Sequence, residues 1–131
     1  MSGEAPQRTP WERLGGDEGV RALVDRFYLA MDTLPQAKTI RAMHAGDLAP
    51  MADKLATFLI GWMGGPQRYR ERFGRVIIPA AHEPFDIGAD EREQWLLCMR
   101  VALEEGGAEP DLLEMLMPAF GQMARMCQTR D

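Results

Sequence analysis

Only two histidines, His44 and His82, occur among the 131 residues of the chain, and His82 has the more unusual setting. Pro79 and Pro84 flank it, so the backbone around its imidazole is short and braced. A metal ion bound by a histidine needs a neutral imidazole at a fixed angle, and a proline-braced backbone is one way to hold it. A lone histidine is more often an ordinary surface or core residue, so His82 needs support from its surroundings.

Tyr28 and Trp95 could serve the same site, because each carries a hydrogen-bond donor on a large apolar body. Tyr28 lies on the apolar face of an expected helix, and Trp95 lies on the long helix expected after His82. For either residue taken alone, core packing with a satisfied polar tip is the more common role. His44 stands at the end of a short expected helix, where a pocket donor and an exposed helix end are both open interpretations.

Glycines, prolines and capping residues divide the chain into helices. Thr9 before Pro10 marks a helix start, and apolar residues then recur at the spacing of one amphipathic face. The expected helices run from Pro10 to Gly15-Gly16, from Asp17 to Leu34-Pro35, over a short stretch ending near His44, from an Asp47 cap to Gly64-Gly65-Pro66, from about Ala89 to Glu105, and from Pro110 onward. Residues 76–78 are too short to form a strand pair alone, so the fold class is all-α.

The apolar spacing also predicts which side chains face the core. The inner faces expected of the last three long helices consist of Leu48, Met51, Leu55, Phe58, Leu59 and Trp62; of Trp95, Cys98, Met99, Ala102 and Leu103; and of Leu112, Leu113, Leu116, Met117, Phe120, Ala124 and Cys127. The length fits one core, so we expect a flexible tail over 1–9 and one domain over 10–131.

Composition excludes several classes of protein. The net charge of -5 and the absence of a basic stripe argue against a nucleic-acid partner. No apolar run approaches the ~20 residues of a membrane span, and the polar start lacks a secretory signal, so a cytoplasmic location is expected. Cys98 and Cys127 are expected to be buried free thiols, too few for a zinc cage.

Several motifs together resemble one family. The segment from His82 to Ile87, followed by Gln94-Trp95-Leu96-Leu97-Cys98-Met99, is similar to the proximal signature of the group II truncated haemoglobins. Phe27-Tyr28 resembles a Phe-Tyr pair of that family, and Trp11–Gly16 and Gly61–Pro66 resemble its opening and the end of its distal helix. The resemblance implies a two-over-two helical sandwich enclosing a haem.

The resemblance also implies roles for single residues. His82 corresponds to the proximal iron ligand, while Tyr28 and Trp95 correspond to the distal donors that face the gas ligand. His44 falls at a variable polar or aromatic position. Met51 and Leu55 match inner positions of the distal helix and, being apolar, would form a wall; the Met51 sulfur as a sixth iron ligand is the less favoured alternative.

The remaining site residues would contact the haem body or its edge. Tyr69 matches a family position near the propionates, and Arg72 belongs to an arginine-rich segment that could equally be a solvated face. Pro79-Ala80-Ala81 stands where many members carry basic residues that pair with a propionate. The expected haem-packing residues are Phe58, Phe85, Ile87, Trp95, Met99, Leu116 and Phe120, with Phe27 beside the ligand.

The function expected from the resemblance is a haem b protein that binds oxygen, with nitric oxide, carbon monoxide or sulfide as further ligands and a reductase as partner. A peroxidase or nitric-oxide dioxygenase is a second hypothesis, although no acid–base pair for peroxide cleavage is evident and no catalytic residue is assigned. A haem-free helical interaction module is a third, favoured only by the missing basic residues before His82.

Overall fold

The computed structural model describes residues 8–44, 46–74 and 86–129, and within these ranges every regular element is a helix. The predicted all-α class is therefore confirmed. His82 and Phe85 lie outside the described residues. The helices are α1 (Pro10–Leu14), α2 (Gly16–Thr33), a short 3-10 helix η1 (Pro35–Ala37), α3 (Lys38–Ala42), α4 (Ala49–Trp62), α5 (Arg68–Phe73), α7 (Ala89–Glu105) and α8 (Pro110–Met126).

The first helix begins where its capping residues predict. The Thr9 hydroxyl accepts a hydrogen bond from the Glu12 backbone N–H at 3.1 Å, and the Glu12 carboxylate accepts one from the Thr9 N–H at 3.4 Å. This reciprocal pair satisfies two donors that a helix start leaves free. Gly15 then adopts φ 104°, which ends α1 and lets α2 start in a new direction.

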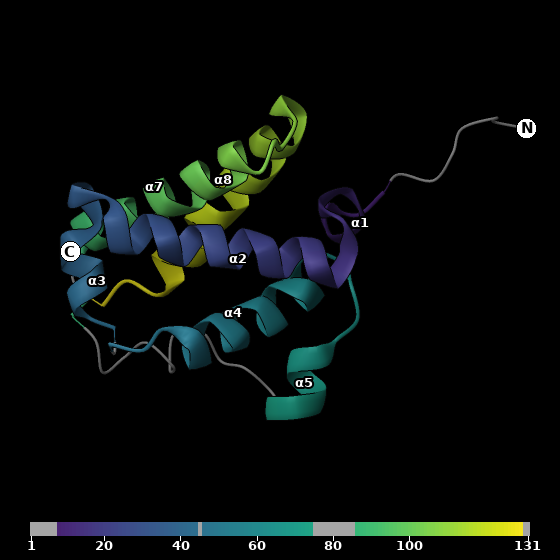
Figure 1. Cartoon of the computed structure of the whole chain (residues 1–131), viewed down its shortest axis with the longest axis horizontal. Coiled ribbons are helices and arrows are strands. Elements are labelled where there is room, and N and C mark those ends of the chain that lie inside the picture. Colours follow the sequence, from purple (N-terminus) through teal and green to yellow (C-terminus); the bar gives the residue numbers. More distant parts are fainter. Residues whose placement is uncertain (1–7, 45, 75–85, 130–131) are drawn as a thin grey trace, which may run out of the picture.

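The long helices form two packed pairs, α2 with α4 and α7 with α8 (Figure 1). Helix α2 also packs along α7, so it joins the two pairs. This arrangement is the predicted two-over-two sandwich. The ends of α1, α2 and α7 lie at the predicted glycine and proline breaks. Helix α4 has Leu48 rather than the predicted Asp47 at its N-cap, although the Asp47 carboxylate accepts a hydrogen bond from the Ala49 N–H at 3.0 Å.

Helix α4 has two apolar faces rather than the single predicted stripe. The fully buried face consists of Ala56, Thr57, Leu59 and Ile60. The predicted stripe is only half-buried at Leu55, Phe58 and Trp62, and Met51 is 43% exposed. The prediction of Met51 as an inward residue is therefore wrong in this structure, because the side of α4 that packs most tightly is offset from the stripe.

Helix α7 buries most of the face that its spacing predicts, and α8 buries part of its predicted face, because Leu113, Met117 and Cys127 are only half-buried. Cys98, Met99, Ala102 and Leu103 are at most 1% exposed, whereas Trp95 at the start of that face is only half-buried. On α8 the buried face includes Leu112, Leu116, Phe120, Met123 and Ala124. The site residues Phe27, Met99 and Phe120 thus belong to the core itself.

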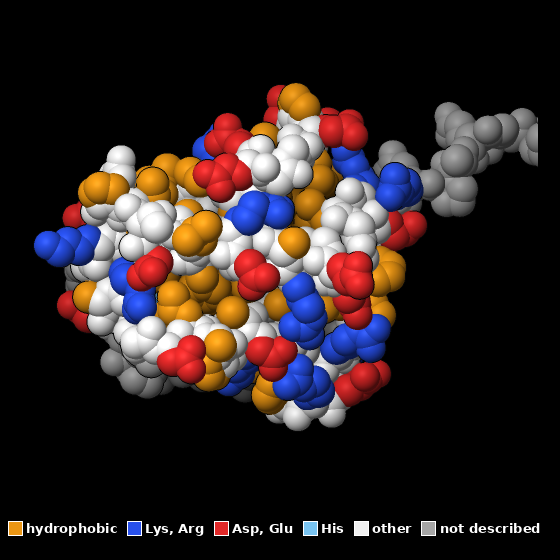
Figure 2. All heavy atoms as spheres, viewed as in Figure 1, with side chains coloured by type: hydrophobic (Ala, Val, Ile, Leu, Met, Phe, Trp, Pro, Cys, Tyr) orange, Lys and Arg blue, Asp and Glu red, His pale blue; other side chains and the backbone are white. Residues whose placement is uncertain are grey.

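The surface mixes the two signs of charge. In Figure 2, acidic and basic side chains are interspersed, and apolar side chains show in the furrow between α2 and α4. None of the helices in the described ranges has the length and apolar character needed to cross a bilayer.

The turn after α4 depends on a close approach of backbone to a side chain. A Cβ atom on Gly65 would lie 2.7 Å from the Trp11 ring and 2.8 Å from the Ile60 carbonyl oxygen. The Trp11 backbone N–H also donates to the Met63 carbonyl at 3.0 Å, so the first helix docks directly on this turn.

Replacing Gly65 with Ala is therefore expected to lower the free energy of unfolding by about 1–3 kcal/mol, because the methyl group overpacks a fixed contact. The matched control is Gly121→Ala on α8, where a Cβ meets no atom within 4 Å. That change should be neutral or stabilising by about 0.5–1 kcal/mol, because alanine favours a helix over glycine. Urea unfolding of both variants tests the contrast, and equal stabilities would refute it.

Candidate functional site

Aromatic rings connect α2, α7 and α8 in the interior. Phe27 is fully buried, and its ring centroid lies 4.9 Å from that of Tyr28 and 5.1 Å from that of Trp95. The Trp95 ring in turn lies 5.6 Å from Phe120, and Phe120 lies 4.7 Å from Trp62 on α4. The row brings the predicted Tyr28 and Trp95 into contact with the same buried ring.

The polar tips of Tyr28 and Trp95 have no hydrogen-bond partner among the described residues. The Tyr28 side chain is 7% exposed, and Trp95 is half-buried. Burial raises the pKa of the Tyr28 hydroxyl above its ordinary value, so this group stays protonated and able to donate. A donor that no described protein group accepts is free to donate to a ligand, which makes these two groups candidates for contact with one.

The predicted His44 also lies at this place. Its ring centroid is 5.9 Å from that of Tyr28, and its Nδ1 lies 2.8 Å from the Ile40 carbonyl oxygen. A carbonyl oxygen only accepts, so Nδ1 carries the hydrogen, and a neutral His44 has its lone pair on Nε2. His44 in this form can accept a hydrogen bond from a neighbour but cannot donate one through Nε2.

One side chain of α7 fixes α3, the short helix that ends two residues before His44. The Gln94 side-chain oxygen accepts a hydrogen bond from the Ile40 backbone N–H at 3.1 Å, across 54 positions of sequence. This N–H lies in the first turn of α3, where a helix offers no internal acceptor. Gln94 therefore holds α3 against the helix that bears Trp95, a role that its place beside Trp95 in the sequence does not reveal.

A second aromatic group lies at the end of α4. The rings of Phe58 and Tyr69 are perpendicular, with centroids 5.9 Å apart. A pocket of about 610 Å³ opens beside them; it is lined by Phe58, Gly61, Trp62, Gln67, Tyr69, Arg70 and Gly74. This volume is in the range of small-molecule and cofactor sites. Trp62 connects this pocket to the aromatic row through Phe120 and was not predicted as a site residue, although it shares the half-buried face of α4 with Phe58.

Residues after α8, Gln128 and Thr129, form hydrogen bonds with Ile87 just before α7 and with Arg92 in its first turn. Ile87 donates its backbone N–H to the Thr129 hydroxyl at 2.8 Å and accepts the Thr129 N–H at 2.7 Å. Arg92 adds a hydrogen bond to the Gln128 side chain at 2.9 Å. These contacts anchor the backbone shortly after the position of His82, which itself lies outside the described residues.

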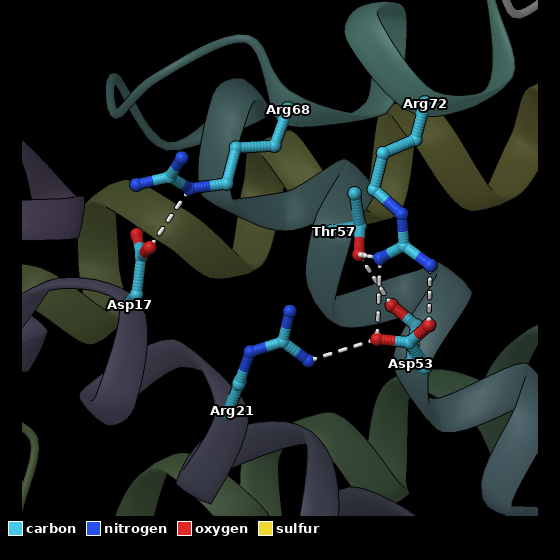
Figure 3. A network of polar contacts seen from close by, with 6 residues as sticks. All are labelled: Asp17, Arg21, Asp53, Thr57, Arg68 and Arg72. Carbon is cyan, nitrogen blue, oxygen red and sulfur yellow. Dashed lines mark hydrogen bonds and ion pairs between the residues drawn. The ribbon is translucent and has the colours of Figure 1, made fainter.

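Arg72, predicted to contact the cofactor, is bound to an acidic partner in the structure. Its guanidinium pairs with the Asp53 carboxylate at 2.9 Å and donates to the Thr57 hydroxyl at 3.1 Å, while Arg21 contacts the same carboxylate at 3.0 Å (Figure 3). The hydrogen bond from Arg72, and to a smaller extent the one from Arg21, holds the pKa of the Asp53 carboxyl below its ordinary value. A cofactor role for Arg72 stays a prediction that this geometry does not support.

The two cysteines are free thiols, as predicted, with Cys98 buried and Cys127 half-buried. Burial raises the pKa of each thiol to about 11, so neither is an activated nucleophile at neutral pH. Within 8–44, 46–74 and 86–129, no three His, Cys, Asp or Glu side chains are grouped to hold a metal ion.

The raised pKa of Tyr28 predicts a dependence of stability on alkaline pH. Above about pH 10 the unfolded chain releases the Tyr28 proton while the folded chain keeps it. The unfolded state then binds fewer protons, so the free energy of unfolding falls as pH rises, by up to about 1.4 kcal/mol per pH unit. The variant Tyr28→Phe should lose stability less steeply than the wild type between pH 10 and 11. Urea unfolding across pH 8–11 measures both slopes, and parallel profiles would contradict a buried, protonated Tyr28.

The amino-acid sequence matches a known protein family and a characterised relative. The model of the bacterial-like globin family matches residues 9–129. A group 2 truncated hemoglobin of Bacillus subtilis is 35% identical over 114 residues, which cover 87% of this chain and 81% of that protein.

Solved structures agree with these matches. The group II 2-on-2 hemoglobin of Agrobacterium tumefaciens superposes with a TM-score of 0.91 at 38% identity, and the match covers 100% of both chains. A truncated oxygen-avid haemoglobin of Bacillus subtilis superposes with a TM-score of 0.83 at 31% identity, over 92% of this chain and 99% of that one. From its helical sandwich and these matches together, the chain belongs to the group II truncated haemoglobins of the bacterial-like globin family.

Proposed function

We propose that this chain binds haem b and uses it to hold a diatomic gas, with oxygen as the main ligand. The observation that carries the proposal is the pair of donors on α2 and α7. Tyr28 and Trp95 both contact the buried Phe27 ring, and neither polar tip has a hydrogen-bond partner among the described residues. Membership of the globin family supports the same class of function.

The predicted cofactor residues suit a haem, and two of them, Phe58 and Tyr69, line the pocket of about 610 Å³. A porphyrin is flat and largely apolar, and the half-buried side chains of Leu55, Phe58 and Trp62 present an apolar face on α4. Met99, Leu116 and Phe120 would pack on the haem from α7 and α8, with Ile87 and Tyr69 at the edges. Neither cysteine belongs to a Cys-x-x-Cys-His motif, so a haem held without covalent attachment is proposed.

Haem, when bound, would supply an iron centre that can hold a diatomic gas. We assign His82 as the protein's iron ligand, on the strength of the sequence resemblance. Tyr28 and Trp95 would donate hydrogen bonds to a gas whose outer atom carries partial negative charge. His44, whose ring lies 5.9 Å from that of Tyr28 between centroids, would help hold the Tyr28 ring in place, whereas Leu55 would exclude water as an apolar wall.

Oxygen is the proposed main ligand because two neutral donors on rigid aromatic bodies favour a gas that gains negative charge. The Bacillus subtilis relative described as oxygen-avid supports this choice. Oxygen binding needs ferrous iron, so a reductase partner in the cytoplasm belongs to the same proposal. Nitric oxide, carbon monoxide and sulfide remain further ligands of the site.

Replacing Tyr28 with Phe keeps the ring and removes the donor. The loss should cost about 1.5–3 kcal/mol of oxygen affinity, which corresponds to about tenfold to a hundredfold faster release. Carbon monoxide gains less charge on binding, so its release should change far less. Rapid-mixing measurements on the haem-loaded wild type, Tyr28→Phe, Trp95→Phe and the double variant give these rates.

Carbon monoxide is the internal control, because a general loosening of the pocket would accelerate the release of both gases. Trp95→Phe also leaves a cavity, so Tyr28→Phe is the cleaner variant. Unchanged oxygen release in Tyr28→Phe, or equal acceleration for both gases, would show that Tyr28 is only a core residue.

A further inference from the structure

Three arginines on α5 differ in their partners. Arg68 pairs with Asp17 on α2 at 2.8 Å, and Arg72 pairs with Asp53 on α4 at 2.9 Å (Figure 3). These two positions are four residues apart, so they lie on one side of the helix. Both guanidinium groups are therefore committed to acidic partners on neighbouring helices.

Arg70 lies on the other side of α5, because it is two residues from each of its neighbours Arg68 and Arg72. It is exposed and lines the pocket of about 610 Å³ between α4 and α5. Among the described residues, Arg70 makes no ion pair or side-chain hydrogen bond, and no other lining residue is charged. The pocket thus combines aromatic walls from Phe58 and Trp62 with one unpaired cation at its rim.

The ion pairs of Arg68 and Arg72 set the orientation of Arg70. They attach one side of α5 to α2 and α4, which fixes the rotation of this six-residue helix about its axis. Arg70, on the opposite side of α5, therefore faces the pocket. The adjacent Tyr69 ring is held by contacts with Phe58 and Phe73, and its phenol is a further donor at the same rim.

We propose that Arg70, assisted by Tyr69, binds the carboxylate groups of the haem, an inference that rests on the proposed function. A haem is an apolar body with two carboxylates at one edge, and the pocket has the matching arrangement of aromatic walls and a cationic rim. A guanidinium is well suited to a carboxylate because it donates two parallel hydrogen bonds. Arg70 would supply the charge that Pro79-Ala80-Ala81 lacks.

The test compares Arg70→Gln with the wild type in two porphyrins. Haem, or haem dimethyl ester with both carboxylates blocked, is loaded into each protein, and its transfer to excess apomyoglobin gives the rate of loss. Arg70→Gln should lose haem about two- to fivefold faster than wild type, the size expected of one exposed ion pair. Loss of the dimethyl ester should be unchanged, and Arg70→Lys should restore part of the haem effect.

Arg100→Gln is the matched control, because Arg100 is an exposed arginine on α7 that does not line the pocket. It should leave both rates unchanged. Equal rates for Arg70→Gln and wild type with haem would overturn the inference, as would equal acceleration with both porphyrins. A wild type that retains neither porphyrin would overturn the proposed function, and this inference with it. A wild type that retains haem, with an Arg70→Gln variant that loses it at the same rate, would overturn this inference alone.

Discussion

Phe27 is fully buried where α2 packs against α7, and its ring contacts both Tyr28 and Trp95. Apolar packing, rather than hydrogen bonding, therefore fixes the positions of the two donors. A side chain held by its ring can leave its polar tip free, which a hydrogen-bonded side chain cannot. The remaining features of the site depend on this contact, because it sets the distance between the helix with the hydroxyl and the helix with the indole.

The polar contacts of the chain have a different role, since they orient short elements around that core. Gln94 attaches α3 to α7, and Thr129 attaches the chain end to Ile87. Asp53 joins Arg21 and Arg72 across three helices. Exposed ion pairs of this kind contribute little stability, but they can determine which side of a short helix faces a pocket. Polar contacts at the periphery thus complete a site whose centre is apolar.

Much of the fold could be predicted from local signals. Thr9, the glycine pairs and the prolines mark helix ends because their effects act within one turn, and the apolar spacing of α7 and α8 identifies their buried faces. The exposure of Met51 could not be predicted, since spacing shows that α4 has an apolar face but not which neighbour covers it. The Arg72–Asp53 pair joins α5 to α4, and charge alone does not distinguish it from a solvated arginine.

The candidate site divides in the same way. Tyr28, Trp95 and His44 were predicted from a resemblance, and the structure brings their rings together. Trp62 and Arg70 were not predicted as site residues, because their places in the pocket depend on how α5 is rotated against α4. The roles of His82 and Phe85 remain predictions, since both residues lie outside the described ranges.

The most direct test of the account is the visible spectrum of the ferrous carbon monoxide form after titration of the purified chain with haem. The wild type should take up haem and give the spectrum of a histidine-ligated globin. His82→Ala should fail to retain haem or show a changed spectrum, whereas His44→Ala, which removes the other imidazole, should keep both haem and spectrum. A His82→Ala protein with undiminished haem content and an unchanged spectrum would contradict the assignment of His82 as the iron ligand.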